Sequence, residues 1–270
     1  MTPVLELRDA QLSFGARCLW HGLNLAVGAG EFVAVLGANG SGKTTLLKAI
    51  LGLQSLSGGT VQIGDEPPRR GSGLVGYIPQ ERRLSPPTPI RARDLVGLGI
   101  DGQRWGPGRP SRARKAAVAA ALDSVGATAL ADRPVHLLSG GEQQRVRIAQ
   151  AIATDPLLLL CDEPLLSLDL THQRSVVRLI DERRRSHGTA VLFVTHEINP
   201  VLPYVDRVLY LADGRFSIGT VDEVMTGPSL SALYGSPVEV IRTGGRIVVA
   251  GIPDAPAHET THLSDDEAAG

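Results

Sequence analysis

The sequence has few of the features that mark secreted, membrane-spanning or nucleic-acid-binding proteins. Its 270 residues contain only two cysteines, Cys18 and Cys161, which lie far apart and indicate no disulfide framework. No apolar run approaches the roughly 20 residues that cross a bilayer, and the start MTPVLELRDA has no basic segment followed by an apolar core. The formal net charge of −1 gives no basic excess for nucleic acid. We therefore expect a cytosolic globular chain that binds no nucleic acid and reaches a membrane only through a partner.

Hydrophobic residues make up 43% of the chain, which is sufficient for a core, and their pattern predicts an α/β protein. Short alternating stretches within residues 4–31, with a further strand at 60–64, predict an N-terminal antiparallel β subdomain. A stretch rich in Pro, Gly and Arg and then in helix formers predicts a mobile, inserted α-helical subdomain. From residue 157 onward, apolar strands alternate with helices, which is typical of a parallel-sheet core.

The C-terminal region ends this organisation. A hairpin is expected to turn at Gly244 and Gly245, and the segment 253–270 has the low hydrophobicity and acidic bias of a disordered tail. The other expected parts are a core at 1–80 and 155–225, the helical subdomain at 81–154, and a C-terminal helix and hairpin at 226–252.

The segment GANGSGKTT lies between a strand-like run, EFVAVLG, and a helix-like run, KTTLLKAILGL. It fits the pattern GxxxxGK[ST], in which glycines let successive backbone N–H groups converge on phosphates. Lys43 can then reach the β- and γ-phosphate oxygens, and the Thr44 hydroxyl can ligate Mg2+. The pattern predicts a nucleotide-binding site. Its expected binding residues are Gly37, Asn39, Gly40, Ser41, Gly42, Lys43, Thr44 and Thr45.

The run LLLLCDEP is continuously apolar, as expected of a strand buried on both faces, and it ends in two adjacent carboxylates, Asp162 and Glu163. Neighbouring strand residues point to opposite faces, so we expect the two carboxylates to have different roles. One can hold the Mg2+ shell while the other addresses the attacking water. The alternative is a surface strand that ends in a solvated acidic pair.

A second glycine-rich element, LSGGEQQRVRIAQAIA, begins a helix. Ser139 and Glu142 are spaced as a capping box. Gly140 and Gly141 leave the helix tip open, and the positive end of the helix dipole favours a phosphate there. The alternative is an ordinary capped helix whose buried face carries Val146, Ala149, Ile152 and Ala153.

Gln80 and His196 each stand just past the carboxyl end of an apolar run, LVGYIP and AVLFVT respectively. The phosphate-binding loop and the paired carboxylates occupy the same position in two further predicted strands. Open parallel sheets bind ligands in the crevice at these carboxyl ends, so we expect one crevice to receive them all. Taken singly, a Gln or His at a strand end is more often an ordinary loop residue.

In this order and spacing, GANGSGKTT, Gln80, LSGGEQQR, LLLLCDEP, SLD at 167–169 and His196 resemble the motifs of an ATP-binding cassette (ABC) ATPase. The resemblance covers residues 4–225 and implies the fold of that family, with residues 1–252 as a single cassette. It also implies a head-to-tail homodimer that forms with ATP and sandwiches two ATP molecules. Each ATP would lie between the phosphate-binding loop of one subunit and the LSGGE segment of the other.

The resemblance implies catalytic and metal-binding roles for the residues at the strand ends. Glu163 would polarise the attacking water, and His196 would contact the γ-phosphate. Gln80 would sense Mg2+ and water and link the site to a transporter. Thr44 and Asp162 would support the metal, with Lys43 and Thr45 on the phosphates.

The resemblance also assigns residues to the ATP sandwich. Ser139 and Gly141 would contact the γ-phosphate across the dimer, with Gly140 and Glu142 beside them. Asp169 would couple the two sites, and Phe14 would stack on adenine. Two departures from the common pattern are the leucines of LLSLD and the glutamate that ends LSGGE.

A cassette with no membrane segment resembles the importer type, in which the ATPase docks under a separate permease. The segments THEINPVLPYVDRVLYLADGR and LSALYGSPVEVI resemble the branch that takes up manganese, zinc or iron from a separate metal-binding protein. This implies an ATP-hydrolysing subunit at the cytoplasmic face of the cell membrane, held there by the permease. Importer subunits for iron chelates or cobalamin are similar, and a non-transport ABC protein is a further alternative.

One motif lies outside this pattern. The segment His258–His262, HETTH, matches HExxH, which binds Zn2+ when it lies on a helix. Two prolines precede it and two β-branched threonines disfavour a helix, so we expect no protease site there. A weak metal-sensing tail is the alternative.

Overall fold

The computed structural model describes residues 2–15, 17–80, 89–102, 111–166 and 168–251. Ser167 of the SLD segment, and the predicted tail with its HETTH motif, lie outside the described residues.

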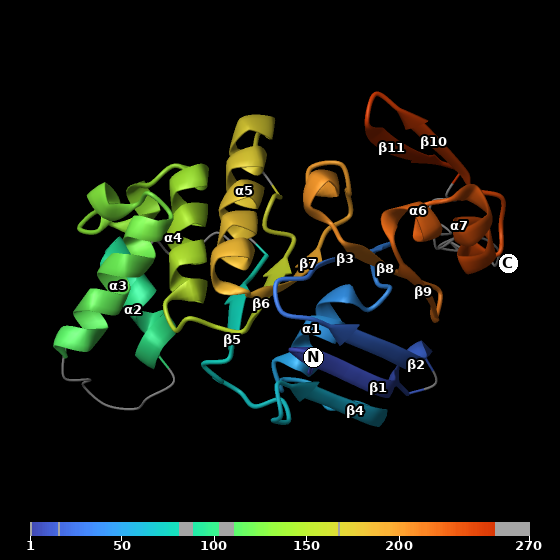
Figure 1. Cartoon of the computed structure of the whole chain (residues 1–270), viewed down its shortest axis with the longest axis horizontal. Coiled ribbons are helices and arrows are strands. Elements are labelled where there is room, and N and C mark those ends of the chain that lie inside the picture. The colour runs from blue at the N-terminus through green and yellow to red at the C-terminus, as the bar shows by residue number, and fades with distance from the viewer. Residues whose placement is uncertain (1, 16, 81–88, 103–110, 167, 252–270) are drawn as a thin grey trace, which may run out of the picture.

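A six-stranded sheet runs through the centre of the molecule, in the order β5-β6-β7-β3-β8-β9 (Figure 1). Its first five strands are parallel, and only β9 runs antiparallel to its neighbour β8. The carboxyl ends of the parallel strands therefore share one edge. The strands are β3 (Phe32–Gly37), β5 (Val75–Ile78), β6 (Leu158–Asp162), β7 (Ala190–Val194), β8 (Arg207–Ala212) and β9 (Arg215–Gly219).

A second, antiparallel sheet is formed by the N-terminal region, in the order β2-β1-β4. Its strands are β1 (Leu5–Phe14), β2 (Arg17–Val27) and β4 (Gly58–Ile63). Helix α1 (Lys43–Ile50) packs with this sheet and with one face of the central sheet in a common apolar cluster. The predicted N-terminal antiparallel sheet and parallel core are both confirmed.

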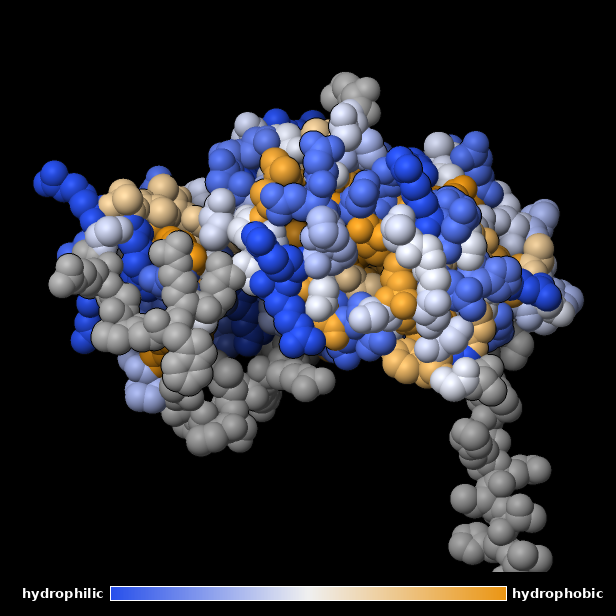
Figure 2. All heavy atoms as spheres, turned by 90° about the horizontal axis from the view of Figure 1, so that it is seen from below, coloured by the Kyte–Doolittle hydropathy of each residue, from blue (hydrophilic) through white to orange (hydrophobic). Residues whose placement is uncertain are grey.

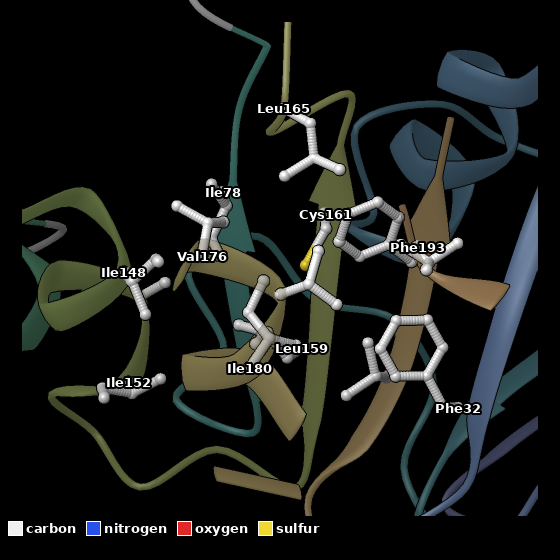
Figure 3. Packing of buried hydrophobic residues seen from close by; sticks show 14 of the residues in the cluster. Phe32, Ile78, Ile148, Ile152, Leu159, Cys161, Leu165, Val176, Ile180 and Phe193 are labelled. Carbon is white, nitrogen blue, oxygen red and sulfur yellow. The ribbon is translucent and has the colours of Figure 1, made fainter. Parts of the chain in front are cut away.

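The two faces of the central sheet belong to two different hydrophobic cores. On β6, Leu158 and Leu160 pack with α1 and the antiparallel sheet, whereas Leu159 and Cys161 pack on the opposite side. The alternation follows from the two-residue period of a strand and explains why residues 158–161 are apolar throughout. Figure 3 shows the second core, in which the sheet residues Phe32 and Phe193 and the β6 side chains meet the helices α4 (Gly140–Ile152) and α5 (Leu170–His187).

Three of the helices lie between β5 and β6 in the chain and form one end of the molecule (Figure 1). They approach closely because glycines replace side chains at the contacts. A Cβ on Gly99 would lie 2.1 Å from the carbonyl oxygen of Gln150, and a Cβ on Gly76 would lie 2.3 Å from that of Ala151. Helix α4 is thus held tightly against its neighbours. The other elements here are α2 (Ala92–Asp101), α3 (Arg112–Ser124) and the short 3-10 helices η1 (Thr128–Leu130) and η2 (Val135–Leu137).

The C-terminal elements form the opposite end of the molecule (Figure 1). The predicted hairpin is present, with Gly244 and Gly245 at positive φ in its turn. The Asn199 side chain pairs with both backbone groups of Ile247, at 2.9 Å to each, and so ties the hairpin to the loop after β7. These elements are α6 (Val221–Val224), α7 (Gly227–Tyr234), β10 (Glu239–Thr243) and β11 (Arg246–Ala250), and the short 3-10 helix η3 (Leu202–Tyr204) precedes them in the chain.

Hydrophilic side chains cover most of the face seen from below, with hydrophobic ones in smaller patches between them (Figure 2). Within the described ranges, no helix has both the length and the apolar character required to span a bilayer.

Candidate nucleotide-binding site

The predicted phosphate-binding loop connects β3 to α1, and its glycines are required by its conformation. Gly37 and Gly42 have φ values of 140° and 99°, which L side chains rarely adopt. A Cβ on Gly37 would lie 2.0 Å from the carbonyl oxygen of Leu211, and one on Gly42 would lie 2.9 Å from Nε1 of Trp20. Only glycine lets the chain turn this closely over β8 and β2.

The amino end of α1 is suited to bind an anion. No side chain caps the helix, so its first N–H groups point outward without an intrahelical acceptor. Lys43 is 6% exposed, and its Nζ donates to the carbonyl oxygens of Gly37 and Ala38 at 2.7 and 2.8 Å. Burial lowers the pKa of Lys43, and the carboxylates of Glu163 and Asp162 oppose that shift. The loop thus holds a buried ammonium group beside free N–H donors, which is the donor set that phosphate oxygens accept.

Ser41 provides a further test of this fit. Its Oγ is buried, and within the part of the chain that the structure describes it has no hydrogen-bond partner. A buried hydroxyl without a partner is unfavourable. The Ser41 hydroxyl can therefore still form a hydrogen bond when a ligand binds to the loop.

Asp162 lies at the end of β6 and is 2% exposed. Its Oδ1 accepts a hydrogen bond from the Thr44 hydroxyl, and its Oδ2 accepts one from the Tyr77 hydroxyl, both at 3.2 Å. Burial raises the pKa of Asp162, and these two hydrogen bonds only partly oppose that effect. A carboxylate and a hydroxyl side by side are hard oxygen ligands of the kind that Mg2+ takes.

The described residues contain no cluster of three or more His, Cys, Asp or Glu side chains that could hold a metal by themselves. Mg2+ is usually held by one or two carboxylates together with the phosphates of a nucleotide, and Asp162 beside the Thr44 hydroxyl supplies oxygen ligands of that kind. The residues present therefore suit a Mg2+–nucleotide pair.

Glu163 follows the strand and leaves its pleat. Its φ is 47°, in the left-handed region that a residue with a side chain seldom adopts. The Nε2 of Gln80 donates to Oε2 of Glu163 at 3.2 Å, and Nδ1 of His196 lies 3.8 Å from the same oxygen. The predicted gathering of polar residues at the strand ends is therefore present. The reasoning from opposite strand faces was wrong for Glu163, because the turn and not the pleat sets its direction.

A cavity of about 610 Å³ lies over the loop and these side chains. Its size falls within the roughly 300–1,000 Å³ of small-molecule sites. Every lining residue except Leu166 was predicted from the sequence. The lining is formed by Asn39, Gly40, Gly42, Lys43, Thr44, Thr45, Gln80, Glu163, Leu166 and His196.

The LSGGE residues are absent from the lining of this cavity. Ser139 caps α4, and Glu142 completes the predicted capping box. Hydrogen bonds from Ser139 hold the pKa of the Glu142 carboxyl below its usual value. Asp169 caps α5 and also lies outside the lining. A single chain thus does not join the two glycine-rich elements around one cavity.

Phe14 ends β1, is 50% exposed and does not line the cavity. Its expected contact with adenine stays a prediction. The same turn does reach the phosphate-binding loop through Arg17, whose guanidinium donates to the Gly40 carbonyl at 3.1 Å. Sequence reasoning missed Arg17, Tyr77 and Leu166. Tyr77 had a signal, because it stands three residues before Gln80 on the strand that leads to the site.

Comparisons with known proteins agree with this geometry. Residues 20–166 match the family described as ABC transporter. A zinc import ATP-binding protein, ZnuC, of Cereibacter sphaeroides is 38% identical over 213 residues, which are 79% of this chain and 81% of that protein. An aliphatic sulfonates import ATP-binding protein, SsuB, of Pseudomonas fluorescens is 37% identical over 79% of this chain and 75% of that protein.

Solved structures give the same result. A chain from a structure described as an inward-facing conformation of a metal-chelate type ABC transporter superposes with a TM-score of 0.78. It is 28% identical, and the match covers 92% of this chain and 96% of that one. Motifs, fold and relatives agree, and the chain belongs to the ABC transporter family as one of its ATP-binding, ATP-hydrolysing members.

Proposed function

We propose that this chain is the ATP-hydrolysing subunit of an importer for a transition-metal ion, namely zinc, manganese or iron. The observation that carries the proposal is the similarity to zinc import ATP-binding proteins over most of the chain. The structural likeness to a metal-chelate type transporter supports it independently.

The geometry supports a division of labour among the cavity residues during hydrolysis. Lys43 turns from the Gly37 and Ala38 carbonyls to the β- and γ-phosphates, beside the N–H groups of α1. Thr44 and Asp162 hold Mg2+, which when bound offsets the charge of the phosphates.

In this proposal Glu163 accepts the proton of the attacking water, and Gln80 orients the Glu163 carboxylate through their 3.2 Å hydrogen bond. His196, beside the same carboxylate, contacts the γ-phosphate. In this proposal the exposed Phe14 stacks on adenine.

A second copy of the chain completes the site in this proposal. At the tip of α4, Ser139 and Gly140 are exposed and Glu142 is half-buried, whereas Gly141 is buried, and the cavity of their own chain uses none of the four. A head-to-tail dimer brings that tip onto the γ-phosphate of the partner, where the helix dipole favours negative charge. Asp169, at the adjoining end of α5, couples the two sites.

The permease is expected to dock where the helical segment meets the sheet. A groove of about 310 Å³ runs between β5, α2 and α4. Its wall includes Tyr77, which contacts Asp162, and the exposed Leu98. A permease segment bound in this groove would contact β5, the strand that leads to Gln80. Docking of this kind places the chain at the cytoplasmic face of the membrane, while a separate binding protein delivers the metal.

Cells whose only copy of the chain carries Glu163→Gln test the proposal. We expect their zinc, manganese or iron content, measured by elemental mass spectrometry, to fall during growth with a chelator. Addition of that one metal should restore growth. Cells that carry Asn24→Ala, a change on the antiparallel sheet away from the cavity, provide the matched control.

Unchanged metal content in the Glu163→Gln cells would contradict a metal cargo. A defect confined to growth on a sulfonate, an iron chelate or cobalamin would assign the chain to that cargo instead. Recovery of the chain from detergent extracts with a polytopic membrane protein supports transport, whereas recovery with DNA or ribosomes would refute it.

A further inference from the structure

The two segments that we propose face the second subunit are the tip of α4 and the start of α5. They contact each other within one chain. Gly141, in the first turn of α4, is buried, and the imidazole of His172, in the first turn of α5, lies directly over it. A Cβ on Gly141 would lie 2.2 Å from Cδ2 and 2.9 Å from Nε2 of His172. Real Cβ atoms essentially never show contacts under 3.0 Å. The close approach of the ring therefore requires glycine at this position.

His172 is anchored on its other edge. Its Nδ1 donates to Oδ2 of Asp169 at 2.7 Å, and its backbone N–H donates to Oδ1 at 2.9 Å. Asp169 is also the residue that caps α5. The ring is thus fixed between the carboxylate and the α4 tip, although nearly half of its side-chain surface is exposed.

The helices that carry these residues cannot easily separate. Their apolar faces share one core, in which Ile148 of α4 and Val176 of α5 are nearly fully buried (Figure 3). Arg145 of α4 also donates to the hydroxyl of Ser175 of α5 at 3.2 Å. Moving α4 away would open a packed core, which costs more than losing one exposed hydrogen bond. Any side chain added at Gly141 would therefore displace the His172 ring.

We infer that His172 is a positioning residue, which holds Asp169 and supports the Gly141 tip so that both present a fixed surface to the second subunit. Gly141 must then lack a side chain because the His172 ring of the same chain occupies the space that a side chain needs. This reason is additional to any contact between Gly141 and nucleotide. This inference rests on the proposed function for the roles of Asp169 and Gly141.

Steady-state ATP hydrolysis by the full-length chain tests the inference through the pair Gly141 and His172. Gly141→Ala should lower kcat, because its methyl group displaces the ring and with it Asp169. Adding His172→Ala removes the obstruction, so the double variant should exceed Gly141→Ala by at least about twofold, as expected for residues in direct contact, and should not exceed His172→Ala. Adding His172→Asn instead should give no rescue, because an asparagine amide atom takes the place of Cδ2.

His172 can also be tested alone, with no change at Gly141. His172→Ala should lower kcat by about threefold to tenfold with little change in KM for ATP, since the loss of a positioned contact acts on assembly and not on the cavity. His172→Asn should restore most of the activity, because its amide can still donate to Asp169. His187→Ala, at the far end of the same helix, is the matched control and should leave kcat unchanged.

The outcomes separate this inference from the proposed function. A wild-type chain that does not hydrolyse ATP even together with its permease contradicts the proposed function. With an active wild type, a His172→Ala variant with unchanged kcat overturns the inference. A double variant no better than Gly141→Ala overturns the claim that the His172 ring is what limits Gly141 to glycine. Thermal melts identify any variant that fails to fold, and the single His172 variants then decide.

Discussion

Replacing Glu163 by glutamine removes a proton acceptor while keeping the shape of the side chain. In the structure, the Glu163 carboxylate accepts from Nε2 of Gln80 at 3.2 Å, and an amide oxygen at the same place can still do so. The cavity and the Lys43 ammonium stay as they are. We therefore expect ATP to bind normally to Glu163→Gln and to accumulate in a closed dimer that does not turn over.

The magnitude follows from the lost proton transfer. General-base catalysis by a positioned side chain contributes about 10²–10⁴-fold, so kcat should fall by that factor while the Kd for ATP changes little. Phosphate release measures the first quantity and calorimetric titration the second. Normal hydrolysis by this variant would refute the role of Glu163.

The backbone of Glu163 adds a second, independent test. A left-handed conformation costs a residue with a Cβ about 1–2 kcal/mol, and glycine loses about 0.5–1 kcal/mol more backbone freedom on folding. Glu163→Gly should thus be more stable than Glu163→Ala by up to about 1.5 kcal/mol, a rise in Tm of up to about 6 °C for a domain of this size. Both variants should be inactive. A Glu163→Gly variant less stable than Glu163→Ala would contradict the strained backbone of the turn.

Three further changes have defined expectations. Lys43→Ala removes a charged donor to phosphate, so the Kd for ATP should rise about 10- to 150-fold by calorimetry, and unchanged binding would contradict its role. Asp162 has a folded-state pKa above its unfolded value, so its ionisation makes the fold less stable as the pH rises through that interval. Asp162→Asn should therefore stabilise the nucleotide-free chain above about pH 4 and abolish Mg2+-dependent hydrolysis. In melts at several pH values, the difference in stability between this variant and the wild type should grow with pH. A difference that stays constant would refute the argument. Asn199→Ala leaves the nearly buried backbone groups of Ile247 unpaired and should cost about 1–3 kcal/mol in urea unfolding, whereas the exposed Asn24→Ala should cost less.

The parts of the site that could be predicted are those that short local patterns determine. The glycines of the loop before Lys43 follow from a turn that allows no Cβ, and the Ser139 cap follows from the spacing to Glu142. The strand-end positions of Gln80 and His196 follow from apolar runs of fixed length, because parallel strands end at a common edge.

The remainder depends on pairs that are distant in the sequence. Tyr77 meets Asp162, and His172 meets Gly141, only because the sheet order and the helix packing bring them together. No property of a glutamate indicates that the chain will turn left-handed at Glu163. The role of Phe14 stays a prediction, because the cavity of a single chain does not include it.

Because the central sheet is shielded on both faces, its strands and the loops at its rim should open on very different timescales. All five residues of β6 and of β7 are buried, and their amides are hydrogen-bonded to neighbouring strands. Amide hydrogen exchange should be slowest there and should report global unfolding. Gln80, Glu163 and His196 stand just past the ends of β5, β6 and β7, so we expect their amides to exchange faster than those of the strands, which can stay closed while these side chains adjust to a nucleotide.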